Sequence, residues 1–220
     1  MKLTFEGQPS FTFVHVDLEP GESFTAESDA MASMDADVDM DAKFNGGFFS
    51  GLMKKYLGGE SLFVNVFSNR TSSIKRVTIT QPFPGGMMEK ELKGDSFCLQ
   101  PGAYVCSTPG VKLGVKWAGF ASLIAREGLF KLVVSGNGKV VFGCFGALIE
   151  KHVEGEYIVD SSHLVGYDPQ MKLSIQLAGN LISSLTSGEG FVTRVKGNGK
   201  IIMQSRSLSG MTHWINPHLF

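Results

Sequence analysis

Four aspartates alternate with small or apolar residues in the segment Asp35-Ala36-Asp37-Val38-Asp39-Met40-Asp41. On an extended strand, alternate side chains share one face, so this spacing predicts a row of four carboxylates. Carboxylate oxygens bind hard cations such as Ca²⁺, but alternate strand residues stand about 7 Å apart, too far for all four to reach one ion. We therefore expect a solvated or edge-protecting acidic face, or a contact for a basic surface on a partner subunit.

The histidines and cysteines lack the spacings of metal or nucleophile motifs. The sequence contains no His-x-His, no His-Glu-x-x-His and no Gly-x-Ser-x-Gly, and Cys98, Cys106 and Cys144 form no Cys-x-x-Cys. Cys144 follows an apolar run, where burial disfavours the reactive thiolate. Near the carboxyl end, His213 is expected on a tail anchored by the packing of Trp214. The sequence thus predicts no metal site, no cofactor and no catalytic residues.

A glycine-rich insertion over Phe44–Tyr56 combines apolar with basic side chains. One interpretation is an ordered loop that caps one end of the first strand unit. The other is an interaction loop that packs on another subunit or touches an anionic membrane surface peripherally. The candidate contact residues are Phe48, Phe49, Leu52, Lys54 and Lys55.

The composition indicates one globular domain spanning residues 1–220. Hydrophobic residues make up 43% and charged residues 19% of the chain, and 220 residues suffice to bury a core without disulfides. The amino-terminal residues turn polar at once, and the longest apolar run, Val140–Ile149, falls short of the ~18 residues of a spanning helix. We therefore expect a cytoplasmic protein. Residues 1–43 hold ten acids and two bases, whereas the bases of the remainder are scattered, which disfavours a nucleic-acid footprint.

Several short segments recur at one constant offset along the chain. The segment Val134–Val141 (VSGNGKVV) returns as Val195–Ile202 (VKGNGKII), and Gly94–Phe97 returns as Gly155–Ile158 at the same offset. A more diverged copy begins near Gly21. The sequence predicts three repeated units at about 16–82, 89–146 and 150–210. Each unit is too small to bury its strands alone, so a pseudo-threefold arrangement with a shared core is expected.

Local patterns within the units favour strands. Alternation in Ser61–Ser68 has period two, and Asn-Gly pairs at 137–138 and 198–199 are typical of type I′ hairpin turns. Two hairpins are therefore expected, joining 129–135 to 139–145 and 191–196 to 200–205. Helix is expected only near 51–56 and 121–126.

The stretch from Gly46 to Phe63, which ends in Leu-Gly-Gly-Glu-Ser-Leu-Phe, resembles the altered inheritance of mitochondria protein twenty-four family. The later Glu-Gly and Gly-Asn-Gly segments fit the same pattern, so the resemblance spans essentially the whole chain. It implies a fold similar to the tryptophan RNA-binding attenuation protein (TRAP), with triplicated β units in a double-stranded β-helix style. It implies no enzymatic activity and no catalytic residues.

These features favour an all-β, non-enzymatic, oligomeric binding or scaffold protein. Unsatisfied strand edges favour a homotrimer or larger ring, with a protein partner as a further expectation. Two alternatives stay open: nucleic-acid binding by analogy with the fold, and a metal- or small-molecule-dependent enzyme in a β-barrel mouth.

Overall fold

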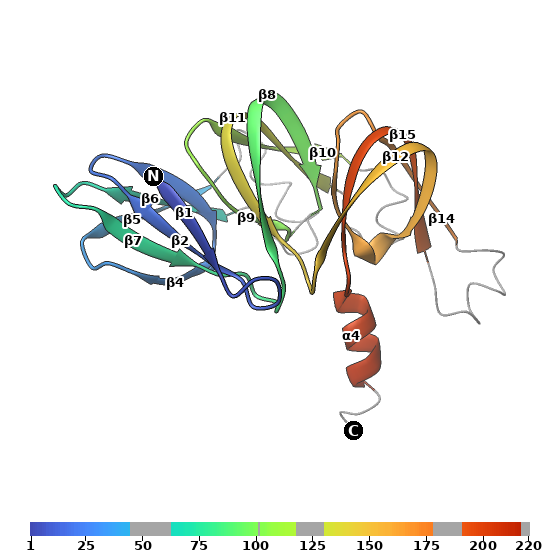
Figure 1. Ribbon diagram of the computed structural model, residues 1–220, viewed down its shortest axis with the longest axis horizontal. Helices are drawn as coiled ribbons and strands as arrows, with labels where there is room; N and C mark the ends of the chain where they lie inside the picture. The colour runs from blue at the N-terminus through green and yellow to red at the C-terminus, as the bar shows by residue number, and fades with distance from the viewer. Residues whose placement is uncertain (45–62, 101, 118–129, 178–190, 217–220) are drawn as a thin grey trace.

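The computed structural model describes residues 1–44, 63–100, 102–117, 130–177 and 191–216 (Figure 1). The described part is nearly all β, with two antiparallel sheets and one short α-helix. The two segments expected to hold helix, 51–56 and 121–126, lie outside the described residues. The helix that is described, α4 (Leu208–Ile215), lies where the sequence analysis predicts none.

The strands form three groups in chain order. The first group comprises β1 (Lys2–Glu6), β2 (Phe13–Leu18), β3 (Ser23–Glu27), β4 (Met31–Met34), β5 (Val38–Phe44), β6 (Phe63–Asn69) and β7 (Lys75–Ile79). The second comprises β8 (Met87–Leu99), β9 (Tyr104–Ser107), β10 (Val111–Trp117) and β11 (Phe130–Gly143). The third comprises β12 (Leu148–Asp160), the 3₁₀ turn η1 (Ser161–His163), β13 (Leu164–Tyr167), β14 (Lys172–Leu177) and β15 (Phe191–Gln204).

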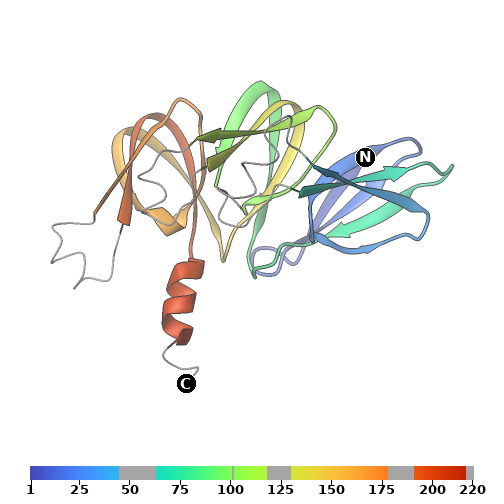
Figure 2. The ribbon, with the colours of Figure 1, turned by 180° about the vertical axis from the view of Figure 1, so that it is seen from behind.

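The three groups lie in a row, with the first and third at opposite ends (Figures 1 and 2). Strands β1, β2, β7 and β4 form the smaller sheet, in that order. The larger sheet runs β12-β15-β13-β8-β11-β9-β3-β6-β5, with β10 added on β11 and β14 on β15. Adjacent groups are joined by two ladders, β3 with β9 and β8 with β13. No ladder among the described strands joins the first group to the third, so the row differs from the expected pseudo-threefold arrangement.

The predicted Asn-Gly hairpins are wrong. Asn137 and Gly138 lie inside the single strand β11, and the equivalent pair lies inside β15. The ladder with β8 shifts register between Ser135 and Asn137, so the glycines form an irregularity where a long strand bends rather than reverses. Glycine is required there because a Cβ on Gly136, whose φ is 108°, would stand 2.3 Å from the Gly110 carbonyl oxygen.

Neighbouring groups share their hydrophobic cores. The first cluster combines Phe24 and Phe67 of the first group with Val105 and Val141 of the second. The next clusters likewise join residues of the second and third groups. Each junction is therefore a packed apolar interface, as expected for groups too small to bury their strands alone.

Candidate interaction surfaces

The acidic segment does not lie on one strand, which corrects the predicted row of four carboxylates. Asp35 and Asp37 belong to the turn between β4 and β5, whereas Asp39 and Asp41 lie on β5. The turn interrupts the period-two alternation, because Asp35 accepts a hydrogen bond from the Val38 backbone N–H. The four side chains are exposed, but they do not form one continuous face.

Basic side chains of the same chain contact this segment. Lys75 Nζ lies 2.7 Å from Asp37 Oδ2, and Arg70 Nε lies 3.0 Å from Asp39 Oδ2. The hydrogen bond from Lys75 holds the pKa of Asp37 below its usual value. Ion pairs within the chain therefore offset part of the charge that was expected to attract a basic surface on a partner subunit.

The insertion residues Phe48, Phe49, Leu52, Lys54 and Lys55 lie outside the described residues. Their role as an interaction loop thus stays a prediction.

The three thiols are buried, as the apolar context of Cys144 predicts. Burial raises the pKa of Cys106 to about 12 and that of Cys144 to about 11, so both remain protonated near neutral pH. Within the described residues, no group of three His, Cys, Asp or Glu side chains is placed to hold a metal ion.

Four chain segments meet on one side of the row and form what we call the connector face. It consists of residues 7–12, 81–86, 144–147 and 205–207, together with α4. Backbone hydrogen bonds join the segments in sequence: Thr12 N–H donates to Gly85 O, Gly86 N–H to Gly146 O, and Ser205 N–H to Ala147 O. The Phe83 and Phe145 rings lie 6.4 Å apart on this face.

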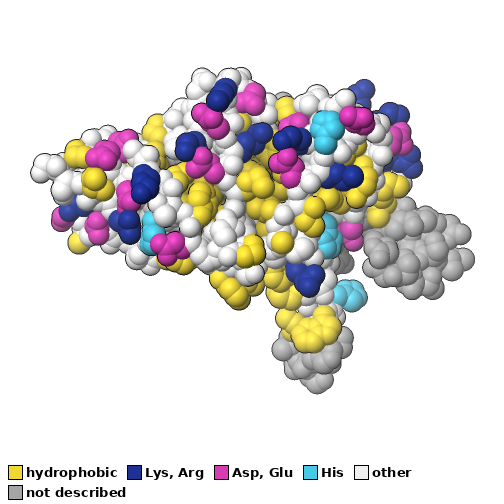
Figure 3. Space-filling model, viewed as in Figure 1, with side chains coloured by type: hydrophobic (Ala, Val, Ile, Leu, Met, Phe, Trp, Pro, Cys, Tyr) yellow, Lys and Arg dark blue, Asp and Glu magenta, His cyan; other side chains and the backbone are white. Residues whose placement is uncertain are grey.

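The connector face carries exposed apolar side chains and lacks acidic residues. Neither Asp nor Glu occurs in its four segments or in α4. The Phe11 side chain is 74% exposed, and Figure 3 shows hydrophobic side chains along this lower edge of the body and on α4. Exposed large apolar side chains at one face of the body and on the helix that leaves it are typical of a contact surface.

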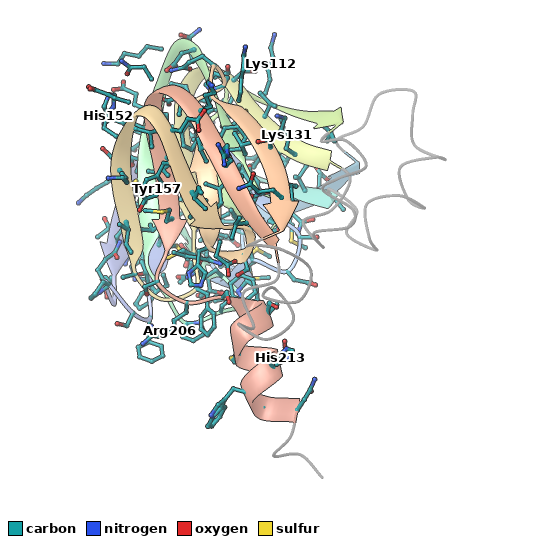
Figure 4. The ribbon with its side chains drawn as sticks, turned by 90° about the vertical axis from the view of Figure 1, so that its right-hand side faces the viewer. Lys112, Lys131, His152, Tyr157, Arg206 and His213 are labelled. Carbon is teal, nitrogen blue, oxygen red and sulfur yellow. The ribbon has the colours of Figure 1, made fainter. Side chains whose placement is uncertain are left out.

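Helix α4 leaves the body at this face and projects away from it (Figures 1 and 4). It begins after Ser207, whose side chain accepts a hydrogen bond from Gly210 N–H, as an N-cap does. Arg206 lies at the base of the helix and His213 on its side (Figure 4). Every residue of α4 is at least partly exposed.

Trp214 does not anchor the tail, contrary to the sequence prediction, because it is 69% exposed. Leu208 and Met211 are also exposed, and their spacing of three residues places them along one side of the helix with Trp214. The sequence did contain this signal: a capping serine is followed by apolar residues at helical spacing. No helix in the described residues has the length and hydrophobicity of one that crosses a membrane.

Charged side chains on the third group are largely paired across β12 and β15. Glu156 receives hydrogen bonds of 2.8 Å from both Arg194 and Lys196, and the bond from Lys196 is the main cause of the lowered pKa of Glu156. Glu150 pairs with Lys200 at 2.7 Å. These bases are therefore held by carboxylates of the same chain.

Comparisons with known proteins agree with the fold. The crystal structure of protein SPYM3_0169 from Streptococcus pyogenes superposes with a TM-score of 0.81, at 23% identity and over 99% of each chain. An uncharacterized protein of Streptococcus pyogenes serotype M6 is 25% identical over 229 residues, which cover all of this chain and 91% of that protein. The family model described as mitochondrial biogenesis AIM24 matches residues 3–206. The chain therefore belongs to the AIM24 family, as the motif ending in Leu-Gly-Gly-Glu-Ser-Leu-Phe indicated.

Proposed function

We propose that this protein is a non-enzymatic, oligomeric binding or scaffold protein of the cytoplasm, whose connector face contacts a protein partner. The observation that carries the proposal is the exposure of Phe11 on one segment of the connector face and of Leu208, Met211 and Trp214 on α4, in segments without acidic residues. Large aromatic side chains are the usual anchors of protein interfaces, and Trp ranks first among them.

The architecture that we propose for this scaffold is three repeated TRAP-like units of the double-stranded β-helix type. The support is the spacing of the strands: β12 follows β8, and β15 follows β11, at the offset of the sequence repeat, and the bounds match at both ends. Their partners correspond as well, because β10 pairs β11 as β14 pairs β15. Repetition of this kind builds an extended platform from small units.

Nucleic-acid binding, the alternative from fold analogy, has weaker support. Binding of single strands uses open aromatic faces beside basic residues. Lys90 and Lys131 lie over the rings of Phe97 and Tyr167, but both rings are buried. These pairs therefore offer no stacking surface to a base.

Native mass spectrometry of the full chain, purified gently from its own host, tests the proposal. We expect a multiple of the chain mass or a stoichiometric second polypeptide. The double variant Phe11→Ser/Trp214→Ser should lose bound partner mass, whereas Ile74→Ser, an exposed apolar position on the β6–β7 connection, should not. A bare single chain from the unaltered protein would contradict the proposal.

A further inference from the structure

The junction between neighbouring groups is built twice in the same way. Between the first and second groups, Thr25 pairs with Ser107 and Ala26 with Cys106. Between the second and third, Cys98 pairs with Tyr167 and Leu99 with Gly166. In both cases a short strand of the later group, β9 or β13, adds antiparallel to the end of a strand of the earlier group.

Strand β4 has the same local geometry as β9 and β13. Each of the three pairs with residues at or near the end of a strand that also pairs on its other side: β4 with β7, β9 with β11, and β13 with β15. Each also skips one residue in its register. In β4 the skip lies between Met31 and Ser33, and the same step occurs in β9 and β13. By this register Ser33 holds the position of Cys106 and Gly166. All four residues of β9 and of β13 are buried under the preceding group, but Ala32 and Ser33 are exposed.

The end of β12 is the corresponding open position at the other end of the row. Cys98 pairs with Val133 in the second group. Arg194 follows Val133 at the offset of the sequence repeat, and it pairs with Ile158. By its ladder partner Ile158 thus holds in β12 the position of Cys98. This is one residue away from the match given by the sequence offset, because the β8–β11 ladder shifts register between Ser135 and Asn137 and the β12–β15 ladder does not. Cys98 is 3% exposed because β13 covers it, whereas Ile158 is 52% exposed.

Within the described strands, β4 pairs only with β7, and β12 only with β15. The two open edges lie at opposite ends of the row (Figures 1 and 2), so one chain cannot join them to each other. The open edge of β4 has the register with which β9 and β13 pair with the preceding group, and the open edge of β12 has the register with which β8 pairs with the following group. An exposed edge with a matching partner edge on the same molecule favours head-to-tail association of copies.

We propose that two copies of this chain join end to end, with Ile158 and Val159 of one copy pairing antiparallel with Met34 and Ser33 of the next. The joint repeats the ladder that links the groups within the chain, and it buries Ile158 against the first group of the neighbouring copy. This inference rests on the oligomeric part of the proposed function and names the surfaces that carry it. The contact is heterologous, so its repetition gives a closed ring or a linear array.

Cysteine cross-linking between two singly substituted proteins tests this joint. The native cysteines Cys98, Cys106 and Cys144 are buried, so a short bismaleimide should label only introduced thiols. Ser33→Cys and Ile158→Cys both place a thiol at an exposed position. We expect a cross-linked dimer when the two variants are mixed, and little when either is treated alone. Ile74→Cys, mixed with either variant, is the matched control and should give no dimer.

The outcomes separate this inference from the proposed function. A dimer from Ser33→Cys alone would indicate a symmetric contact and overturn the head-to-tail joint. An oligomer in native mass spectrometry without cross-linking in the mixture would overturn the joint but leave the scaffold proposal standing. A monomer at all concentrations would overturn both. As a second measurement, Met34→Pro removes a backbone donor from the open edge, because Asp35 N–H donates to Arg76 O on β7 and the preceding N–H therefore points away from β7. This variant should lower the oligomer fraction at least tenfold if the joint is correct.

Discussion

A Cβ atom placed on Gly166 would lie 2.6 Å from Phe97 Cε1. Strand β13 therefore passes directly over the Phe97 ring, and the second and third groups meet at this point without room for a side chain. The Cys98 carbonyl oxygen would lie 2.9 Å from the same Cβ atom, so the backbone of β8 also leaves no room for a side chain at this position.

Gly166→Ala should consequently destabilise the fold by about 1–3 kcal/mol, the usual cost of overpacking a close-packed interior. Chemical unfolding in urea measures the change. Gly114→Ala is the matched control, because Gly114 also lies on a strand but its nearest neighbour, the Val133 carbonyl oxygen, would be 3.7 Å away. The control should change the free energy of unfolding by less than about 0.5 kcal/mol. Equal effects of the two substitutions would contradict the tight junction.

Asp17 should titrate below its usual pKa of 3.8 in the folded protein. The main cause is the Arg76 guanidinium, whose Nε donates to Asp17 Oδ1 at 2.6 Å across the β2–β7 ladder. Because the folded-state pKa is lowered, the pair stabilises the fold above about pH 4, and this contribution is lost as the pH falls through the lowered value.

NMR titration of the Asp17 carboxyl measures this effect. Arg76→Gln should raise its pKa toward the usual value and weaken the pH dependence of stability in acid. Arg70→Gln, which removes the partner of Asp39 instead, should leave the titration of Asp17 unchanged. An Asp17 pKa that does not respond to Arg76→Gln would show that another group governs it.

The buried thiols should react slowly with an aromatic disulfide reagent in the native protein. The pKa values of Cys106 and Cys144, raised to about 12 and about 11, leave few thiolates at mildly alkaline pH, and burial blocks the reagent. In concentrated guanidinium chloride all three cysteines should react at once. A single fast thiol in the native state would disprove this account and would point to a redox role.

Removal of residues 208–220 should leave the stability of the body nearly unchanged. Helix α4 is exposed along its whole length, so its loss removes little buried surface. We expect a change in the free energy of unfolding within about 0.5 kcal/mol, measured by urea titration of the truncated chain. A large loss would mean that the tail packs on the body, as the sequence pattern around Trp214 predicts.

Much of the fold could be predicted from the sequence. The two Gly-Asn-Gly segments and their constant offset indicate corresponding strands, and those strands have matching bounds and partners in the structure. Asn137-Gly138 nevertheless predicts a hairpin that the structure lacks, because positive φ at glycine serves a turn and a bend in a long strand equally well. Whether the chain turns or only bends at these glycines depends on Thr108–Gly110. This segment lies against the strand at that point but is distant from it in sequence.

The candidate surfaces depended more on tertiary structure. The alternation of Asp35 to Asp41 predicts one strand, but the hydrogen bond from Val38 to Asp35 starts a turn inside it. Lys75, on a separate strand, and Arg70, in a loop, form ion pairs that offset part of the negative charge of this segment. The local spacing of the aspartates contains no information about these distant bases.

The sequence by itself determined the all-β class, the family and the burial of the thiols, because strand propensity, repeated glycines and apolar neighbours act locally. The tertiary structure alone decided which edges stay open. By their ladder partners Ile158 and Cys98 occupy corresponding places, yet one is exposed and the other buried, because only Cys98 has a following group to cover it. Whether a strand edge is paired depends on what lies beside it in space, and sequence patterns of the strand do not contain that neighbour.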